Sequence, residues 1–367
     1  GGFAGGGINA VTRSGTNTLT GSAYYFNRNE NLSGKTPTDI DGATRTKLAP
    51  FTARTFGGRL GGALIKNKLF FFANVEIQRD EIPRPFIQSE YNGDSDAARI
   101  NEVRQKLIDT YGYDPGGFEN NAQTTKGEKI LVKLDYNINN KHKLSARHSY
   151  VKGTTEIHPT PSASRVIFEN VGYFFPSTTN STAIELKSIF NSNISNNFIL
   201  GRTTVRDDRD ILGDPFPQIQ INDGNGRIDV GTDNFSYSNI VNQDVFTITN
   251  NFNLYKGKHS FTFGTHNEFF KIENLFTIFS TPRYEYFFNG VNRFLDGENA
   301  DLSLFGHEQA FGGDAIRLGD DATNLGPSFN AMQLAFYGQD EIQVNKDFKL
   351  TVGLRFDVPI FTDDPPL

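Results

Sequence analysis

Short and long connections alternate along this chain. Five short polar turns each join two candidate strands, and a long connection separates each such pair from the next; the turns are 65–68, 139–142, 193–196, 256–259 and 345–347. A soluble sheet has no reason to keep its short connections on one edge, whereas a transmembrane β-barrel has short periplasmic turns and long outward loops. A soluble propeller would repeat a motif every ~40–50 residues, and the sequence contains no such repeat. The alternation therefore predicts a transmembrane barrel.

The candidate strands have one apolar and one polar face. In 129–138, in 332–344 and in 350–358, apolar residues such as Leu134, Phe336 and Leu354 alternate with charged or polar ones. This period of two is typical of a strand with one face in apolar surroundings and the other in water. Further strands are expected at 18–29, 52–64, 69–80, 142–152, 181–190, 197–207, 245–254 and 260–270. The fold class is all-β, an antiparallel barrel wall of about eleven strands.

Composition limits the alternatives. The 367 residues include no Cys, which rules out disulfides and Cys-based metal sites, and the net charge of −6 argues against a nucleic-acid partner. The sequence contains no apolar run of ~18 residues, the length that a membrane-spanning helix needs. The chain holds 34 Phe and 13 Tyr but no Trp, so aromatic girdles at a membrane interface would lack one of their usual members.

The long connections cover about 30–50, 83–126, 155–178, 208–240 and 273–330. One of them contains a predicted helix, with Asp94 or Ser95 as N-cap and Gly112 as stop. Ile100, Val103 and Leu107 share one face of that helix, and Glu102 is spaced to pair with Lys106. We expect this helix to cover part of the loop region.

The sequence contains no catalytic motif, no phosphate-binding loop and no cofactor fingerprint. Six scattered histidines suit polar barrel or surface positions, and they are His142, His148, His158, His259, His266 and His307. Asp223, Asn225 and Asp229 have the spacing of calcium ligands, but Arg227 occupies a ligand position and no glutamate closes the loop. A Gly-Asn turn is the favoured interpretation, and no cofactor or metal is predicted.

Two aromatic clusters in the loops are the candidate substrate-binding residues. Tyr173 and Phe174 belong to the first cluster, and Tyr284 and Tyr286 belong to the second. Their rings could stack on a ligand such as a sugar. Girdle or loop packing explains them equally simply and is the preferred alternative.

Two segments resemble a known family. The first is Gly6-Gly7-Ile8-Asn9-Ala10-Val11-Thr12-Arg13-Ser14-Gly15-Thr16-Asn17 with the strand 21–29 that follows, and the second runs from Gly61-Gly62-Ala63 through Lys66-Asn67-Lys68 to Phe70-Phe71-Phe72. These segments are similar to TonB-dependent outer-membrane receptors of the Oar-like group, at the junction of plug and barrel and at the first periplasmic hairpin. Ala63 departs from the group, which usually has Pro there. A looser similarity covers 103–117.

The resemblance implies a 22-stranded barrel closed by a plug. Residues 1–16 would end the plug domain and 17–367 would form the N-terminal half of the barrel. The chain has no initiator Met or signal peptide and ends just after a strand, so we expect a piece of a longer protein.

Such receptors are not enzymes. They take up a scarce or bulky substrate, such as a metal chelate, glycan or peptide, across the bacterial cell outer membrane. Their partners would be outer-membrane lipid, an extracellular substrate of unknown identity, and the TonB energy-coupling complex, reached through a region outside this chain.

Two alternatives remain open at this stage. An outer-membrane adhesin or surface structural protein would use the same loops without transport. A secreted all-β enzyme would bring carboxylates ~5–10 Å apart in a cleft.

Overall fold

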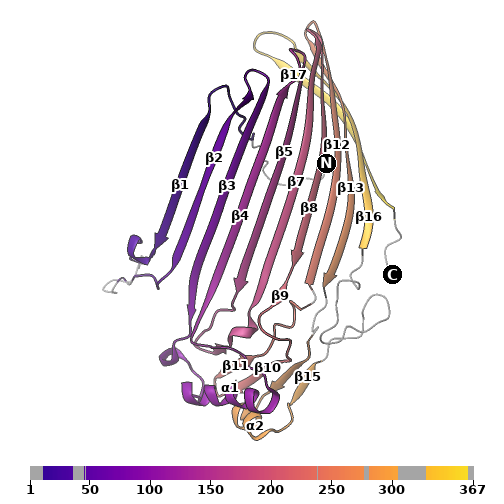
Figure 1. Cartoon of the computed structure of the whole chain (residues 1–367). Helices are drawn as coiled ribbons and strands as arrows, with labels where there is room; N and C mark the ends of the chain where they lie inside the picture. Colours follow the sequence, from indigo (N-terminus) through magenta and orange to yellow (C-terminus); the bar gives the residue numbers. More distant parts are fainter. Residues whose placement is uncertain are drawn as a thin grey trace.

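The computed structural model describes residues 11–35, 45, 47–237, 239–276, 281–304 and 328–362. Its main feature is a tall, curved antiparallel sheet whose strands run side by side in chain order (Figure 1). No helix in these described residues is long and apolar enough to cross a membrane.

Eleven long strands form the path of this sheet, in the order β1-β2-β3-β4-β5-β7-β8-β12-β13-β16-β17. The two-residue β9 (Asp210–Ile211) pairs with β7 at its loop end. The bounds are β1 Thr20–Asn29, β2 Thr52–Ile65, β3 Leu69–Pro85, β4 Asn120–Asn137, β5 His142–Ile157, β7 Tyr173–Asn191, β8 Ile194–Asp208, β12 Asn239–Lys256, β13 His259–Phe276, β16 Ser328–Gln343 and β17 Lys349–Phe361. Each of the eleven predicted strands is present, and most extend further toward the long loops than predicted.

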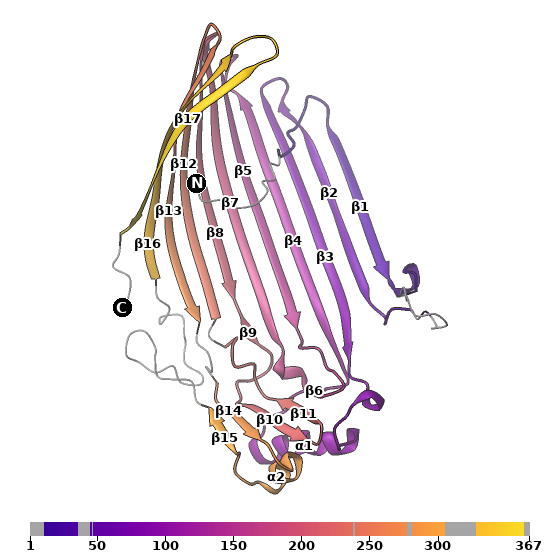
Figure 2. The same ribbon diagram turned by 180° about the vertical axis from the view of Figure 1, so that it is seen from behind.

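The short turns lie together at one end of the sheet and the long connections at the other (Figures 1 and 2). Every short turn joins two neighbouring antiparallel strands, as in the pairs β2–β3 and β4–β5. The predicted alternation of short and long connections is therefore confirmed.

A second, smaller structure stands at the long-loop end, and we call it the crown. It is a five-stranded sheet in the order β15-β14-β10-β11-β6 together with two helices. The bounds are β6 Arg165–Ile167, β10 Gln218–Asp223, β11 Gly226–Val230, β14 Arg283–Tyr286, β15 Leu302–Leu304, α1 Ala97–Tyr111 and α2 Gly290–Asp296. Short 3₁₀ turns lie at Glu30–Leu32, Gln88–Glu90 and Glu169–Val171.

Helix α1 matches the predicted helix, with two local corrections. Ile100, Val103 and Leu107 are fully buried, and Gly112 ends the helix in a left-handed conformation at φ 67°. The N-cap is Asp96 rather than Asp94 or Ser95, because the Asp96 carboxylate accepts the Arg99 N–H at 2.8 Å. Glu102 pairs with Arg99, one turn earlier, and not with Lys106.

The large buried core of the described residues lies in the crown. It is formed by apolar side chains of α1, α2, the crown strands and the preceding loops, among them Phe86, Ile100, Leu107, Phe168, Ile221, Ile228 and Phe294. The tall sheet has no comparable core, and one of its faces is apolar and exposed. Leu134, Phe336 and Leu354 keep 41%, 55% and 73% of their surface exposed, so they are not packed together in a protein interior.

Candidate functional site

The two faces of the tall sheet differ in chemistry, because the strand registers place like residues in the same rows. One row of cross-strand neighbours is Phe71, Leu134, Ala146, Ile184, Leu200 and Ile248. The opposite face carries ion pairs such as Lys129 to Glu76 at 2.7 Å and Lys133 to Asp135 at 3.4 Å. Charged side chains are costly in lipid and are tolerated in an aqueous lumen, so the two faces suit hydrocarbon and water respectively.

Residues 11–17 lie against the polar face. The Lys133 ammonium donates to the Ser14 hydroxyl at 2.9 Å, and the Asn17 amide exchanges two hydrogen bonds with Asn67 in the β2–β3 turn, at 2.5 and 2.7 Å. A cavity of about 590 Å³ remains between this segment and the wall, and Lys143 and Arg147 are among its lining residues. The segment is thus held at the turn end and crosses the polar face.

Gly15 allows this close approach. A Cβ atom there would lie 2.3 Å from the Phe71 carbonyl oxygen and 2.4 Å from that of Gly62. Both are backbone atoms of neighbouring strands and have little freedom to move, so a side chain at this position would displace the segment.

The crown joins segments that are far apart in the sequence. The Asp223 carboxylate, which ends β10, accepts the Tyr91 hydroxyl at 3.0 Å, the Ser95 hydroxyl at 2.9 Å and the Ser95 N–H at 3.1 Å. Burial raises the pKa of Tyr91, and the nearby Asp223 charge adds to this effect. The connection between β3 and α1 is thereby tied to the β10–β11 hairpin.

Tyr284 and Tyr286, two of the predicted binding residues, line one aromatic cavity in the crown. The cavity has a volume of about 480 Å³, and Tyr111, Phe216 and Phe294 also line it. Tyr286 meets the ring of Phe294 edge to face at 5.5 Å, and its hydroxyl donates to the Glu298 carbonyl at 3.1 Å. Ligand pockets commonly have volumes of roughly 300–1,000 Å³, so the volume suits a small ring-bearing group, and the aromatic rings offer faces on which it could stack.

Tyr173 and Phe174, the other two predicted residues, lie elsewhere. They begin β7 at the junction of the tall sheet and the crown, and Arg209 stacks over the Tyr173 ring at 5.1 Å. Neither residue lines the aromatic cavity. The structure brings together one pair of the predicted aromatics and leaves the other pair apart.

The 223–229 segment forms the tight β10–β11 hairpin, with Gly224 at φ 59° in its turn. The Asp223 carboxylate takes three protein donors, and the buried Asp229 is paired with Arg165 and Arg227. Among the described residues no group of three or more His, Asp or Glu side chains is placed to hold a metal ion. The predicted turn is confirmed. Of the six histidines, His307 lies outside the described residues.

The crown sheet was not predicted from the sequence. A signal was present, since 218–221 and 227–230 alternate polar and apolar residues on either side of Gly224 and Gly226. Such short strands are hard to separate from loop sequence by periodicity alone. Two of the four neighbouring crown pairs, β14–β10 and β11–β6, also join different long loops.

The family model described as "Outer membrane beta barrel domain" matches residues 11–110 and 82–364. Among solved structures, the outer membrane transporter YddB from Escherichia coli is similar, with a TM-score of 0.59 at 10% identity, over 95% of this chain and 40% of that one. The siderophore receptor PirA from Acinetobacter baumannii has a TM-score of 0.52 at 11% identity, over 95% and 40%.

At these identities the similarity concerns the fold. The chain spans about 40% of the length of these two structures. A search of curated protein sequences finds no match.

Proposed function

We propose that this chain, which belongs to the outer membrane beta barrel domain family and is located in the outer membrane, is part of a TonB-dependent receptor that imports a scarce or bulky substrate. The supporting observation is the pairing of an apolar band on one face of the tall sheet with a charged opposite face. The similarity to an outer-membrane transporter and a siderophore receptor agrees with this proposal at the level of the fold.

The proposal includes the domain boundary between residues 16 and 17. Residues 1–16 end a plug domain and 17–367 form the N-terminal half of a 22-stranded barrel of the Oar-like group. In support, residues 11–16 precede β1 and lie against the polar face, where a plug would sit. Residues 1–10 lie outside the described part of the chain.

The crown is the proposed site of substrate capture, and the aromatic cavity is its ring-binding element. Tyr284 and Tyr286 offer ring faces to a flat or sugar-like group of a metal chelate, glycan or peptide. Tyr173 and Phe174 form a second aromatic position at the mouth of the barrel. An adhesin is the alternative, because a folded crown would also suit attachment to another surface.

The test is uptake by cells that contain the complete receptor. A panel of labelled metal chelates, glycans and peptides is offered with and without the receptor and with and without TonB. We expect one class to enter only when both are present. Uptake that does not depend on TonB, or binding of cells to a surface without any uptake, would contradict the transporter proposal.

A matched pair of variants tests the cavity. The double variant Tyr284→Leu/Tyr286→Leu keeps apolar bulk but removes both ring faces, and we expect uptake to fall by roughly tenfold or more, the loss of about 1.4 kcal/mol of binding. Phe288→Leu is the control, because Phe288 is 84% exposed in the same loop and does not line the cavity. Equal uptake by both variants would exclude the cavity as the binding element.

A further inference from the structure

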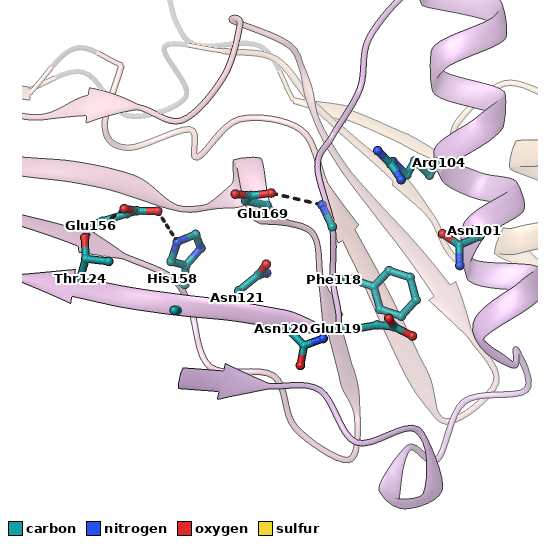
Figure 3. Close-up of a pocket in the computed structure, with 12 residues that line it drawn as sticks. Asn101, Arg104, Phe118, Glu119, Asn120, Asn121, Thr124, Glu156, His158 and Glu169 are labelled. Atoms are coloured by element: carbon teal, nitrogen blue, oxygen red, sulfur yellow. Dashed lines mark hydrogen bonds and ion pairs between the residues drawn. The ribbon is translucent and has the colours of Figure 1, made fainter. Parts of the chain in front are cut away.

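A further cavity lies where α1 meets the loop ends of β4 and β5, and we call it the flank pocket. Its volume is about 470 Å³. Figure 3 shows Thr124, Glu156 and His158 on one side and Asn101 and Arg104 of α1 on the other, with Glu119 and Asn120 between them. None of these residues lines the aromatic cavity, so the two cavities are separate.

Part of the polar lining is fixed by internal hydrogen bonds. Glu156 accepts the Thr124 hydroxyl at 3.0 Å and contacts the His158 ring at 2.9 Å. The Glu169 carboxylate accepts the Gly117 N–H at 3.3 Å. These contacts hold the walls in place without a ligand, as a preformed site requires.

The remaining lining is available to a ligand. Within the described residues, the side chains of Glu119 and Asn120 make no hydrogen bond to protein, and both are exposed at the pocket. A carboxylate only accepts hydrogen bonds, and an amide both donates and accepts. Adjacent hydroxyls of a sugar ring are donors and acceptors at once, so they match this combination.

The charge of the pocket excludes anionic ligands. Glu119, Glu156 and Glu169 contribute three carboxylates. The one guanidinium, Arg104, already makes a two-pronged contact with Asp114 at 2.8 and 2.7 Å. A phosphate or carboxylate ligand would be repelled, whereas a neutral polyhydroxyl group would not.

The strand register places the pocket on the membrane side of the sheet. Thr124 and Ile130 are six residues apart on β4, and the pairing of β4 with β3 and β5 runs without a shift between them. Side chains two residues apart share a face, so Thr124 and its partner Glu156 project from the same face as Ile130 and Leu134. Thr124 stands about 20 Å further along the strand than Ile130, at about 3.3 Å per residue.

We infer that the flank pocket binds a neutral sugar of a glycolipid headgroup in the outer leaflet around the barrel. Its position beyond the apolar band, on the face that meets lipid, points to a membrane-anchored sugar and not to cargo inside the lumen. The inference requires the outer-membrane location of the chain and is independent of transport.

The test uses the complete receptor in vesicles, with two probes. One is a galactose-headed diacylglycerol in the membrane, and the other is a soluble galactose disaccharide. Retention of the glycolipid is measured by native mass spectrometry, and the soluble sugar is titrated by calorimetry.

Gly117→Phe fills the pocket and is the decisive variant. A Cβ atom at Gly117 meets nothing within 4 Å, and its backbone is not left-handed, so the substitution is compatible with folding. Gly153→Phe is the matched control, because Gly153 has the same free space but lies on the polar face of β5. Glu119→Ala/Asn120→Ala removes only side chains that have no protein partner.

We expect glycolipid retention to fall at least tenfold in Gly117→Phe and in the double variant, and to stay unchanged in Gly153→Phe. Equal retention in wild type and Gly117→Phe would overturn the inference, as would equal retention of glycolipid and plain diacylglycerol. Binding of the soluble sugar without retention of the glycolipid would overturn the membrane assignment.

Discussion

At Gly15 the backbone of the N-terminal segment lies close against the barrel wall. Gly15→Ala places a methyl group within 2.3–2.4 Å of two strand carbonyl oxygens, so we expect residues 11–17 to leave the wall while the strands keep their pairing. Limited proteolysis should then cut this segment faster than in the wild type. Gly153→Ala, which has free space, is the control. If the protease cuts residues 11–17 equally slowly in Gly15→Ala and in the wild type, the close contact between this segment and the wall is contradicted.

Asp114 links α1 to the loop that follows it, and its contribution depends on pH. Its hydrogen bonds with the Arg104 guanidinium, together with the Gly116 N–H, hold the pKa of Asp114 below the ordinary value. A lowered folded-state pKa means that stabilisation is full above the unfolded value of ~3.9 and is lost as pH falls through the folded value.

We therefore expect hydrogen exchange in α1 to speed up as the pH falls below about 4, after correction for the intrinsic rate. Asp114→Asn should flatten that dependence. Hydrogen bonding to Arg293 likewise lowers the pKa of Asp301, so Asp301 also loses its stabilising contribution as the pH falls. Burial raises the pKa of Asp233, so the contribution of Asp233 to stability changes with pH in the opposite direction. If hydrogen exchange in α1 depends on pH in the same way in the wild type and in Asp114→Asn, the pH-dependent contribution of Asp114 to the stability of α1 is ruled out.

At the scale of elements, α1 contributes three fully buried side chains to the core of the crown. Leu107→Ala leaves a hole among fully buried side chains, and such changes cost about 2–5 kcal/mol. We expect faster hydrogen exchange in α1, β10 and β11 and no change in β7 and β8, since the crown has its own core. Gln105→Ala, on the exposed side of α1, is the control. A similar rise in the long strands would show that the two parts unfold together.

The long strands carry a second prediction. Leu134→Arg puts a charge on the apolar face, which costs about 2–4 kcal/mol near the middle of a bilayer. Ser145→Arg puts the same charge on the polar face one strand away, near Asp135, and we expect less than 1 kcal/mol there. Unfolding from lipid vesicles by urea measures both. Equal losses would mean that the two faces have the same surroundings.

Local sequence patterns predicted the elements that have one apolar and one polar face. They did not predict the crown strands, whose sheet depends on pairing between segments far apart in the sequence. Strand β17 is predictable because Leu350, Val352 and Leu354 alternate with polar residues along a single run. The crown strand β6 has three residues and pairs with β11, more than 55 residues away in the sequence. Its existence depends on contacts that local periodicity does not encode. The aromatic cavity follows the same rule, since Tyr111, Phe216 and Tyr284 come from three loops.

At the scale of the whole molecule, the described residues form an open wall with two unpaired edges. Strand β1 pairs only with β2, and β17 only with β16. Open edges and an apolar face promote aggregation, so we expect residues 11–362 expressed alone to require detergent. A monodisperse, detergent-free monomer in sedimentation experiments would contradict the barrel-wall account.

Which face of the tall sheet meets hydrocarbon can be measured directly, because the chain contains no Cys and accepts single labels cleanly. Single Cys residues replace Leu134, Phe336 and Leu354 on the apolar face and Lys133, Tyr337 and Arg355 on the polar face of the complete protein in vesicles. We expect the first three to resist a water-soluble maleimide and, once labelled in detergent, to be quenched by brominated lipid, and the second three to behave in the opposite way. Rapid aqueous labelling at Leu134, Phe336 and Leu354 without lipid quenching would refute the membrane-barrel account.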